Sequence, residues 1–266
     1  MAGTKFVLSG SCGQTDFSAL LQFVTMPESR ESEIVACRVS SEIGLDAANP
    51  AKEWRAAQPV RFDANWQGRD SDPALETEIR LLWSPSTLYL RFACRYRELF
   101  VFEDSDPNGR RDRLWDRDVA EAFLQPDYPA LEADRVAPAL KHVAPDALVR
   151  GADEGVRPYM FYKEFEVAPN GMWIDLDISP SGLADLKSGL TRAVHVDKLT
   201  RNWVAEMAIP MKAITAQFDP GAVWRANFYR VEGKAEARQY MAWQPTHTPQ
   251  PNFHVPQAFG TLRFAG

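Results

Sequence analysis

Short runs of alternating apolar and polar residues, separated by turn-forming residues, are the feature that most constrains the fold of this chain. The clearest pair is Glu76–Trp83 and Thr87–Cys94, joined by Ser84-Pro85-Ser86. Because successive side chains of a strand point to opposite faces, this segment predicts a β-hairpin with one apolar face. That face would hold Ile79, Leu81, Trp83, Leu88, Leu90, Phe92 and Cys94, with Tyr89, Arg91 and Arg95 on the wetter side.

Similar runs recur along the chain and predict about nine to eleven strands, as expected of an antiparallel β-sandwich. Helical periodicity is sparse, and a single short helix is predicted near 210–214, where Pro210 can open the first turn. We therefore predict an all-β fold. The further expected strands are Val119–Leu124, Phe161–Val167, Met172–Ile178, Ala193–Asp197, Trp203–Ala208, Val223–Val231, Gln239–Trp243 and Thr261–Phe264.

The chain reads as one domain, because β-sandwiches often reach about 250 residues as a single unit. Residues 1–34 have no clear period and end in a polar run, so we interpret them as an N-terminal extension. Residues 35–266 would form the sandwich. A stretch rich in Pro, Ala and Asp, about 126–157, fits neither strand nor helix and is expected to be a long loop insertion.

Composition excludes several classes of partner. The net charge of -6 argues against nucleic acid, which is bound through clustered Lys and Arg. No stretch approaches the roughly 20 apolar residues of a membrane helix, and the N-terminus lacks the pattern of a secretory signal. We expect a soluble, cytoplasmic protein as the sequence is written, or a periplasmic or secreted one if its start is misplaced or trimmed. The oligomeric state is not indicated.

Six blocks occur in an order that resembles family 9 carbohydrate-binding modules, over roughly 60–264. They are TEIRLLWSPSTLYLRFACR, RLWDRDVAEAFLQP, YKEFEVAPNG, WVAEMAIPMKAI, WRANFYRVEG and AWQPTHTPQPNFHVPQAFGTLRF. The resemblance implies a β-sandwich of jelly-roll type. It also implies that the domain binds mono- or disaccharides, or the end of a polysaccharide chain, by clamping a sugar ring between two aromatic side chains. The insertion at 126–157 departs from the compact family pattern.

The resemblance carries over to particular residues. The first aromatic clamp falls on Trp115 and the second on Phe253, where the best-known modules have Trp. Glu121 matches an acidic residue that hydrogen-bonds sugar hydroxyls. Other polar contacts of the family lie near Glu164, Glu166 and Gln250, although the residue types differ. Some members of the family hold structural calcium, whose ligands cannot be assigned in this sequence.

The residues themselves leave two readings of the site open. Aromatic rings beside carboxylates suit sugar binding, and strand parity would put Trp115 and Glu121 on one side of a sheet. Trp115 could equally be a core residue beside a charged run. His254, with Phe253, follows a Pro-rich loop that could lie at the rim of the sandwich. Arg225 and Asn227 share a strand face and could contact a ligand or form a buried polar network.

Two other functions remain as alternatives. Paired acids such as Glu164 and Glu166 would suit a glycosidase, but acids two apart are common on a wet strand and nothing in the sequence indicates a raised pKa. Related sandwich folds hold haem between a His and a Met. Candidate haem ligands are His195, His247, His254, Met160, Met172, Met207 and Met241. We therefore expect a non-catalytic sugar-binding domain, with a haem or structural module of the same fold as the alternative.

Overall fold

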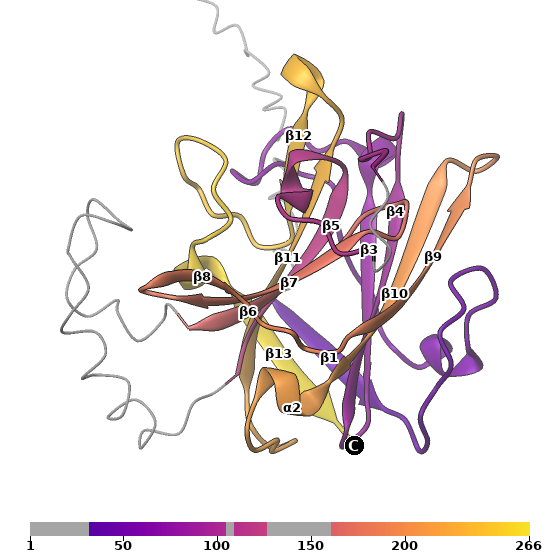
Figure 1. The fold of residues 1–266 in the computed structure, drawn as a ribbon, viewed down its shortest axis with the longest axis vertical. Coiled ribbons are helices and arrows are strands. Elements are labelled where there is room, and N and C mark those ends of the chain that lie inside the picture. The colour runs from indigo at the N-terminus through magenta and orange to yellow at the C-terminus, as the bar shows by residue number, and fades with distance from the viewer. Residues whose placement is uncertain (1–31, 105–108, 127–160) are drawn as a thin grey trace, which may run out of the picture. The chain divides into compact units, whose positions relative to one another are not determined.

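The computed structural model describes residues 32–104, 109–126 and 161–266, and strands dominate the regular secondary structure of these residues (Figure 1). The segments 127–157 and 1–31, which hold most of the predicted insertion and extension, lie outside the described residues. The strands are β1 (Glu33–Arg38), β2 (Val60–Phe62), β3 (Thr77–Trp83), β4 (Thr87–Arg95), β5 (Val119–Gln125), β6 (Tyr162–Val167), β7 (Trp173–Ser179), β8 (Gly182–Asp185), β9 (Thr191–Asp197), β10 (Asn202–Pro210), β11 (Trp224–Glu232), β12 (Gln239–Ala242) and β13 (Gly260–Ala265).

The secondary structure predicted from the pattern is confirmed. The expected hairpin forms β3 and β4, every other expected strand is present, and the short helix near Pro210 is α2 (Met211–Ile214). Three strands were missed. β2 and β8 are short, and β1 follows directly on a polar run, so none of the three stands out from a loop by its alternation.

The strands form one curled sheet whose two halves face each other as a sandwich. Their order is β8-β7-β6-β5-β11-β13-β1-β3-β4-β10-β9, with β12 beside β11 and β2 beside β3. The sequence predicted an antiparallel sheet, but β1 runs parallel to both of its neighbours, β13 and β3. The prediction missed this because β1 was not recognised as a strand.

The main core fills the space between the two halves. Phe92 of β4 meets Phe228 of β11 with ring centroids 6.2 Å apart, and both side chains are fully buried. Arg230 of β11 lies over the ring of Trp203 of β10 at 5.0 Å. The apolar face predicted for the hairpin, from Ile79 to Cys94, lies in this core. Burial of these side chains is the main stabilising contribution to such a fold.

The opposite face of the hairpin is only partly wet. Tyr89, expected on the wetter side, is buried in a smaller cluster with Val39, Trp54, Ala57 and Leu82, because the segment after β1 covers this part of the sheet.

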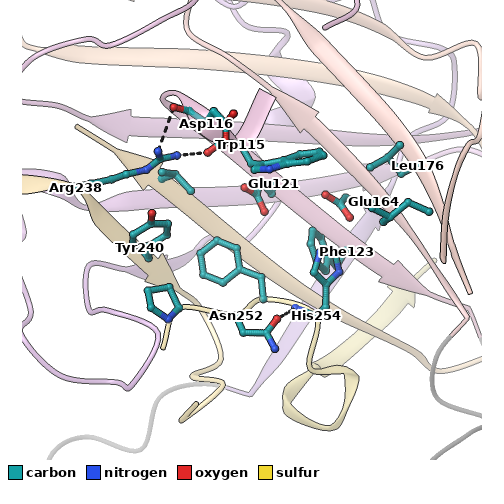
Figure 2. A pocket seen from close by; sticks show the side chains of 14 residues that line it. Trp115, Asp116, Glu121, Phe123, Glu164, Leu176, Arg238, Tyr240, Asn252 and His254 are labelled. Atoms are coloured by element: carbon teal, nitrogen blue, oxygen red, sulfur yellow. Dashed lines mark hydrogen bonds between the residues drawn. The ribbon is translucent and has the colours of Figure 1, made fainter. Parts of the chain in front are cut away.

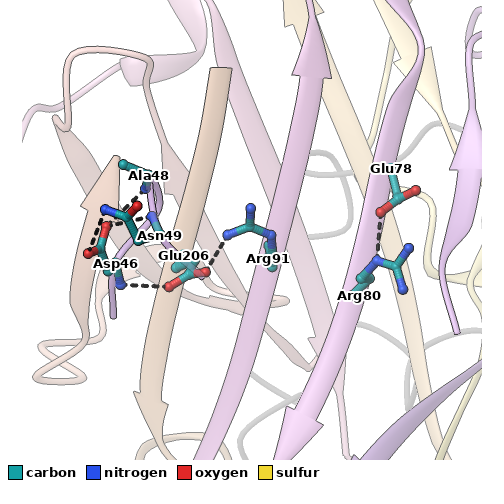
Figure 3. A network of polar contacts seen from close by, with 7 residues as sticks. All are labelled: Asp46, Ala48, Asn49, Glu78, Arg80, Arg91 and Glu206. Atoms are coloured by element: carbon teal, nitrogen blue, oxygen red, sulfur yellow. Dashed lines mark hydrogen bonds and ion pairs between the residues drawn. The ribbon is translucent and has the colours of Figure 1, made fainter. Parts of the chain in front are cut away.

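Charged side chains lie further along the same face (Figure 3). There Arg91 pairs with Glu206 of β10, whose second oxygen accepts the backbone N–H of Asp46 at 2.9 Å. On β3, Arg80 pairs with Glu78 at 2.6 Å. The charges are therefore satisfied within the protein.

Two chemical features of the described residues bear on the sequence expectations. Cys94 is buried in the main core, as expected of a small apolar side chain, whereas Cys37 is half-buried and Cys12 lies outside the described residues. Within these same ranges no helix is long and apolar enough to cross a membrane.

Gly260, at the start of β13, lies in close contact with the backbone of Ser32 and the ring of Trp243. A Cβ there would lie 2.7 Å from the Ser32 carbonyl oxygen and 2.7 Å from a ring carbon of Trp243. We expect Gly260→Ala to lower the free energy of unfolding by about 1–3 kcal/mol, as overpacking of a core does. Gly44→Ala is the matched control, since a Cβ at Gly44 meets nothing within 4 Å. Chemical denaturation of both variants measures the difference, and equal stabilities would contradict the close approach.

Candidate ligand-binding site

A cavity of about 230 Å³ opens on the outer side of the half-sheet formed by β5, β6, β11 and β12 (Figure 2). Its walls carry the rings of Trp115, Tyr240 and Phe253, and its floor carries Glu121, Glu164 and Phe123. In Figure 2, Trp115 lies across the cavity from Asn252 and His254, and the two glutamates lie between these sides. The remaining lining residues are Asp116, Leu176, Leu183, Val231, Arg238 and Pro251.

Trp115 lies on the short 3-10 turn η3 (Leu114–Asp116), immediately before β5. Leu114 is fully buried and anchors the turn, which leaves the side chain of Trp115 half-buried at the cavity wall. Arg238 holds the turn from the other side: it donates to the carbonyl oxygens of Trp115 and, at 3.1 Å, of Asp116. The strand-parity argument for Trp115 and Glu121 was wrong, because Trp115 is not on a strand; both residues nevertheless line the cavity.

Phe253 reaches the cavity from the loop between β12 and β13. Its ring stacks on Tyr229 of β11, with centroids 4.1 Å apart and planes 10° apart, and meets the edge of Tyr240 at 6.2 Å. The Tyr229 hydroxyl also donates to the Phe253 carbonyl oxygen at 3.0 Å. The Phe253 ring is therefore fixed from one face by the sheet, which prepares the wall before any ligand arrives.

The loop that carries Phe253 is tied to the body of the domain. Trp66 Nε1 donates to the carbonyl oxygen of Thr248 at 2.8 Å, and the Trp66 carbonyl oxygen accepts the backbone N–H groups of Thr246 and His247. The Asn252 side chain accepts the N–H of His254 at 3.0 Å. Polar contacts of this kind hold the rim of the cavity in one conformation.

Three glutamates meet at the floor. Glu121 of β5 lies directly opposite Glu166 of β6, and Glu164, two residues before Glu166, lies opposite Phe123. One carboxylate oxygen from each glutamate lies within 4.8 Å of the other two. All three side chains are at least 98% buried, since their exposed fractions are 2%, 2% and 0% for Glu121, Glu164 and Glu166.

Two of these carboxyls, those of Glu121 and Glu166, have a raised pKa. Burial raises the pKa of Glu121 well above 4.5, the negative charge of Glu164 raises it further, and Arg238 opposes both effects. Burial also raises the pKa of Glu166, helped by the charges of Glu121 and Glu164. Nothing in the sequence indicated these raised pKa values, because alternating acids are common on a wet strand face. Here the η3 turn and the loop after β12 cover this face of the sheet.

The raised pKa of Glu166 makes the stability of the fold depend on pH. The unfolded state loses this proton first, so the free energy of unfolding falls as pH rises above the ordinary value of about 4.3. We expect Glu166→Gln to stabilise the fold at pH 8 by about 1–3 kcal/mol, the usual range for an uncompensated buried polar group. At pH 4 the variant should gain little. Thermal unfolding at both pH values checks this, and an equal effect at both would contradict it.

The structure brings only some of the predicted site residues together. Trp115, Glu121, Phe253 and His254 line the cavity. Arg225 and Asn227 do not. Arg225 donates to the carbonyl oxygens of Gln257 and Phe259, and Asn227 is fully buried, donating to the Tyr229 hydroxyl and the Gln244 carbonyl oxygen.

Arg225 and Asn227 thus support the structure, as the alternative of a buried polar network had proposed.

His254 Nδ1 shares a 2.7 Å hydrogen bond with the Tyr162 hydroxyl, and its ring lies 5.4 Å from that of Phe123. Of the other polar positions suggested by the resemblance, Glu164 lines the cavity, Glu166 lies behind it, and Gln250 does not line it.

Sequence reasoning missed several cavity residues. Arg238 immediately precedes β12 and Tyr240 lies two residues later on that strand, so strand alternation extended by one residue would place both on one face. Phe123 shares the face of Glu121 by the same rule. Asn252 gave no such signal, because its position depends on how the loop folds back over β11.

Candidate ligands for a metal or haem can also be located. Among residues 32–104, 109–126 and 161–266, the three floor glutamates are the one group of His, Cys, Asp or Glu side chains close enough to share a metal ion. Of the candidate haem ligands, Met207 and Met241 lie in the main core and Met172 in the cluster beneath the cavity, while Met160 is outside the described residues.

The fold and the cavity together define a β-sandwich with an aromatic-walled pocket on one outer face. Residues 185–264 match the model of carbohydrate-binding family 9, which confirms the resemblance found in the sequence.

Known proteins with similar sequence or structure cover most of the chain. A protein of Arthroderma benhamiae described as "Extracellular protein" is 24% identical over 231 residues, 86% of this chain and 94% of that protein. Two structures of a family 9 module from Caldicellulosiruptor kristjanssonii share the fold. The complex with cellotriose has a TM-score of 0.53 and 13% identity, covering 88% of this chain and 94% of that one. The complex with glucose has a TM-score of 0.54 and 14% identity, covering 88% and 96%.

Proposed function

We propose that this chain is a carbohydrate-binding domain without catalytic activity, and that its cavity holds one sugar ring between Trp115 and Phe253. The observation that carries the proposal is the combination of aromatic walls with a floor of buried carboxylates. Aromatic rings cover the C–H face of a pyranose, while carboxylates accept hydrogen bonds from its hydroxyl groups. The matched family and the sugars bound by the two similar modules, cellotriose and glucose, support this assignment.

The size of the cavity supports a small ligand. At about 230 Å³ it is below the roughly 300–1,000 Å³ typical of small-molecule pockets, so it suits a single ring with any further rings outside. This size supports binding of a mono- or disaccharide, or of the terminal unit of a longer chain, as part of the proposal.

Isothermal titration calorimetry of the full chain against neutral mono- and disaccharides, with and without calcium, tests the proposal. We expect saturable binding at one site per chain for at least one sugar, accompanied by a change in tryptophan fluorescence as the ring covers Trp115. Absence of binding across a panel of hexoses, pentoses and their β-linked disaccharides would contradict the proposal.

A glycosidase is the second candidate, because close carboxyls with a raised pKa are also what such an enzyme uses. The geometry disfavours it. Glu121 and Glu164 project side by side from adjacent strands into one floor, whereas a glycosidase needs acids on two sides of the bond that it breaks. Incubation with aryl glycosides should therefore release no phenol, and release that is lost in Glu121→Gln would favour the enzyme.

A further inference from the structure

The floor of the cavity carries carboxyl oxygens for which the protein itself supplies no hydrogen-bond partner. At the floor, Glu121 Oε1 and Glu164 Oε2 are buried without a hydrogen-bond partner, and so are both carboxyl oxygens of Glu166 behind them. Figure 2 shows the carboxylates of Glu121 and Glu164 directed toward the space between the aromatic walls. An unpaired buried carboxylate is costly, so oxygens arranged in this way point to a partner supplied by the ligand.

The basic side chains near the floor are occupied elsewhere. Arg238 directs two of its nitrogens to the carbonyl oxygens of Trp115 and Asp116, and its guanidinium lies 5.2 Å from the Tyr240 ring. Lys163, the neighbour of Glu164 along β6, pairs with Asp177 at 2.6 Å. Alternation along the strand directs Lys163 and Glu164 to opposite faces of the sheet. Asp116 pairs with Arg113 at 2.9 Å, so among the described residues that line the cavity Glu121 and Glu164 face Arg238 and His254 as the only basic side chains.

We infer that the ligand of this cavity is a sugar that carries a protonated amino group, bound with the ammonium on Glu121 and Glu164 and the ring against Trp115. The inference rests on the proposed function and specifies its ligand. An ammonium group offers three N–H donors and a full positive charge, so it satisfies several carboxylate oxygens at once. A hydroxyl group of a neutral sugar donates one hydrogen bond and leaves the charges unbalanced.

The aromatic walls favour an organic cation over a metal ion. Rings such as those of Trp115 and Tyr240 attract an ammonium through their negative faces. A calcium ion needs about 6–8 oxygen ligands. Among the described lining residues other than the two floor glutamates, only Asp116, Tyr240 and Asn252 carry side-chain oxygens, and Asp116 already pairs with Arg113. An amino sugar uses both the rings and the carboxylates, whereas a metal ion uses only the carboxylates.

Titrations of the full chain with glucosamine, glucose and N-acetylglucosamine test the inference at about pH 6.5, below the ordinary pKa of an amine. We expect glucosamine to bind about tenfold more tightly than glucose, as a charge-assisted contact would give, and more tightly than N-acetylglucosamine, whose nitrogen carries no charge. Equal or tighter binding of glucose would overturn the inference and leave the proposed function intact. Binding of none of the sugars would overturn both.

A calcium titration separates the metal alternative. The chain is titrated with calcium chloride alone and then with glucose in the presence of calcium. We expect neither titration to show binding that depends on calcium, so addition of EDTA should change nothing. Sugar binding that requires calcium would overturn the inference in favour of a metal-bridged ligand.

Glu164→Gln links the preference to the floor. This variant keeps the shape of the side chain and removes its charge, so the ratio of glucosamine to glucose affinity should fall to about twofold or less. Glu53→Gln, on a turn that packs against β3 away from the cavity, removes the same charge and should keep the wild-type ratio. Thermal unfolding of both variants verifies folding. An unchanged ratio in Glu164→Gln would overturn the assignment of the ammonium to this floor.

Discussion

Replacement of Trp115 by alanine is expected to weaken sugar binding by about 30- to 100-fold, which corresponds to the roughly 2 kcal/mol or more of a binding hot spot. The side chain is half-buried at the cavity wall and belongs to a turn that Leu114 and Arg238 hold independently of the ring. The substitution should therefore remove the stacking surface without releasing the backbone. Calorimetric titration of the best sugar from the neutral panel measures the loss.

The unfolding temperature separates a binding role of Trp115 from a core role. Trp115→Ala should unfold within a few degrees of the wild type, because a half-exposed ring contributes less to stability than a fully buried one. Leu199→Ala, at a side chain that is 93% exposed, serves as the control and should retain full affinity. If Trp115→Ala unfolds far below the wild type, the ring is part of the core, and the binding loss carries no information on stacking.

Replacement of Arg230 by alanine is expected to lower the free energy of unfolding by about 3–5 kcal/mol. This is the usual loss when one member of a buried pair of opposite charges is removed and the other is left unpaired. Arg230 is fully buried, donates to the Val231 carbonyl oxygen and lies over the Trp203 ring. Its charge also opposes the rise in the pKa of the buried Asp118, which burial causes. Alanine leaves a cavity between the two half-sheets and deprives Asp118 of a nearby positive charge.

A second pair of variants separates charge from packing at this position. Arg230→Met fills most of the volume without the charge, and Arg230→Met combined with Asp118→Asn also removes the carboxylate. If the loss of charge balance dominates, the double variant should be more stable than the two single losses added together. Asp118→Asn alone completes this comparison, and urea denaturation measures these three variants together with Arg230→Ala. A loss below about 1 kcal/mol in Arg230→Ala would contradict the structural role of Arg230.

Much of the fold could be predicted from sequence because its strands alternate strongly. In β3 and β4 the apolar positions recur at every second residue over nearly the whole strand, and this period determined both the hairpin and its core face. β1 and β2 could not be found in this way. β2 spans three residues, and β1 follows a polar run and is stabilised by pairing with β13, which no local pattern reveals.

Site residues could be predicted where the family resemblance supplied their positions. They were harder to predict where the direction of a side chain decides whether it reaches the cavity. Trp115 and Phe253 line the cavity because two loops bring them there, which spacing alone does not indicate. Arg225 and Asn227 share a strand with Tyr229, yet their side chains end on backbone carbonyl oxygens. The raised pKa of Glu121 depends on burial beneath these loops, and burial is a property of the folded chain.

The position of β1 between β13 and β3 has a consequence for the order of events during folding. Glu33 pairs with Thr261, so about 230 residues must be synthesised before this contact can close. Until then β1 is held in the sheet only by its short pairing with β3, at Cys37 and Arg38. Contacts between residues so distant in sequence slow folding. A nascent chain that lacks β13 would leave one edge of β1 open to pairing with other chains, so chaperone dependence should concentrate in this late stage of synthesis.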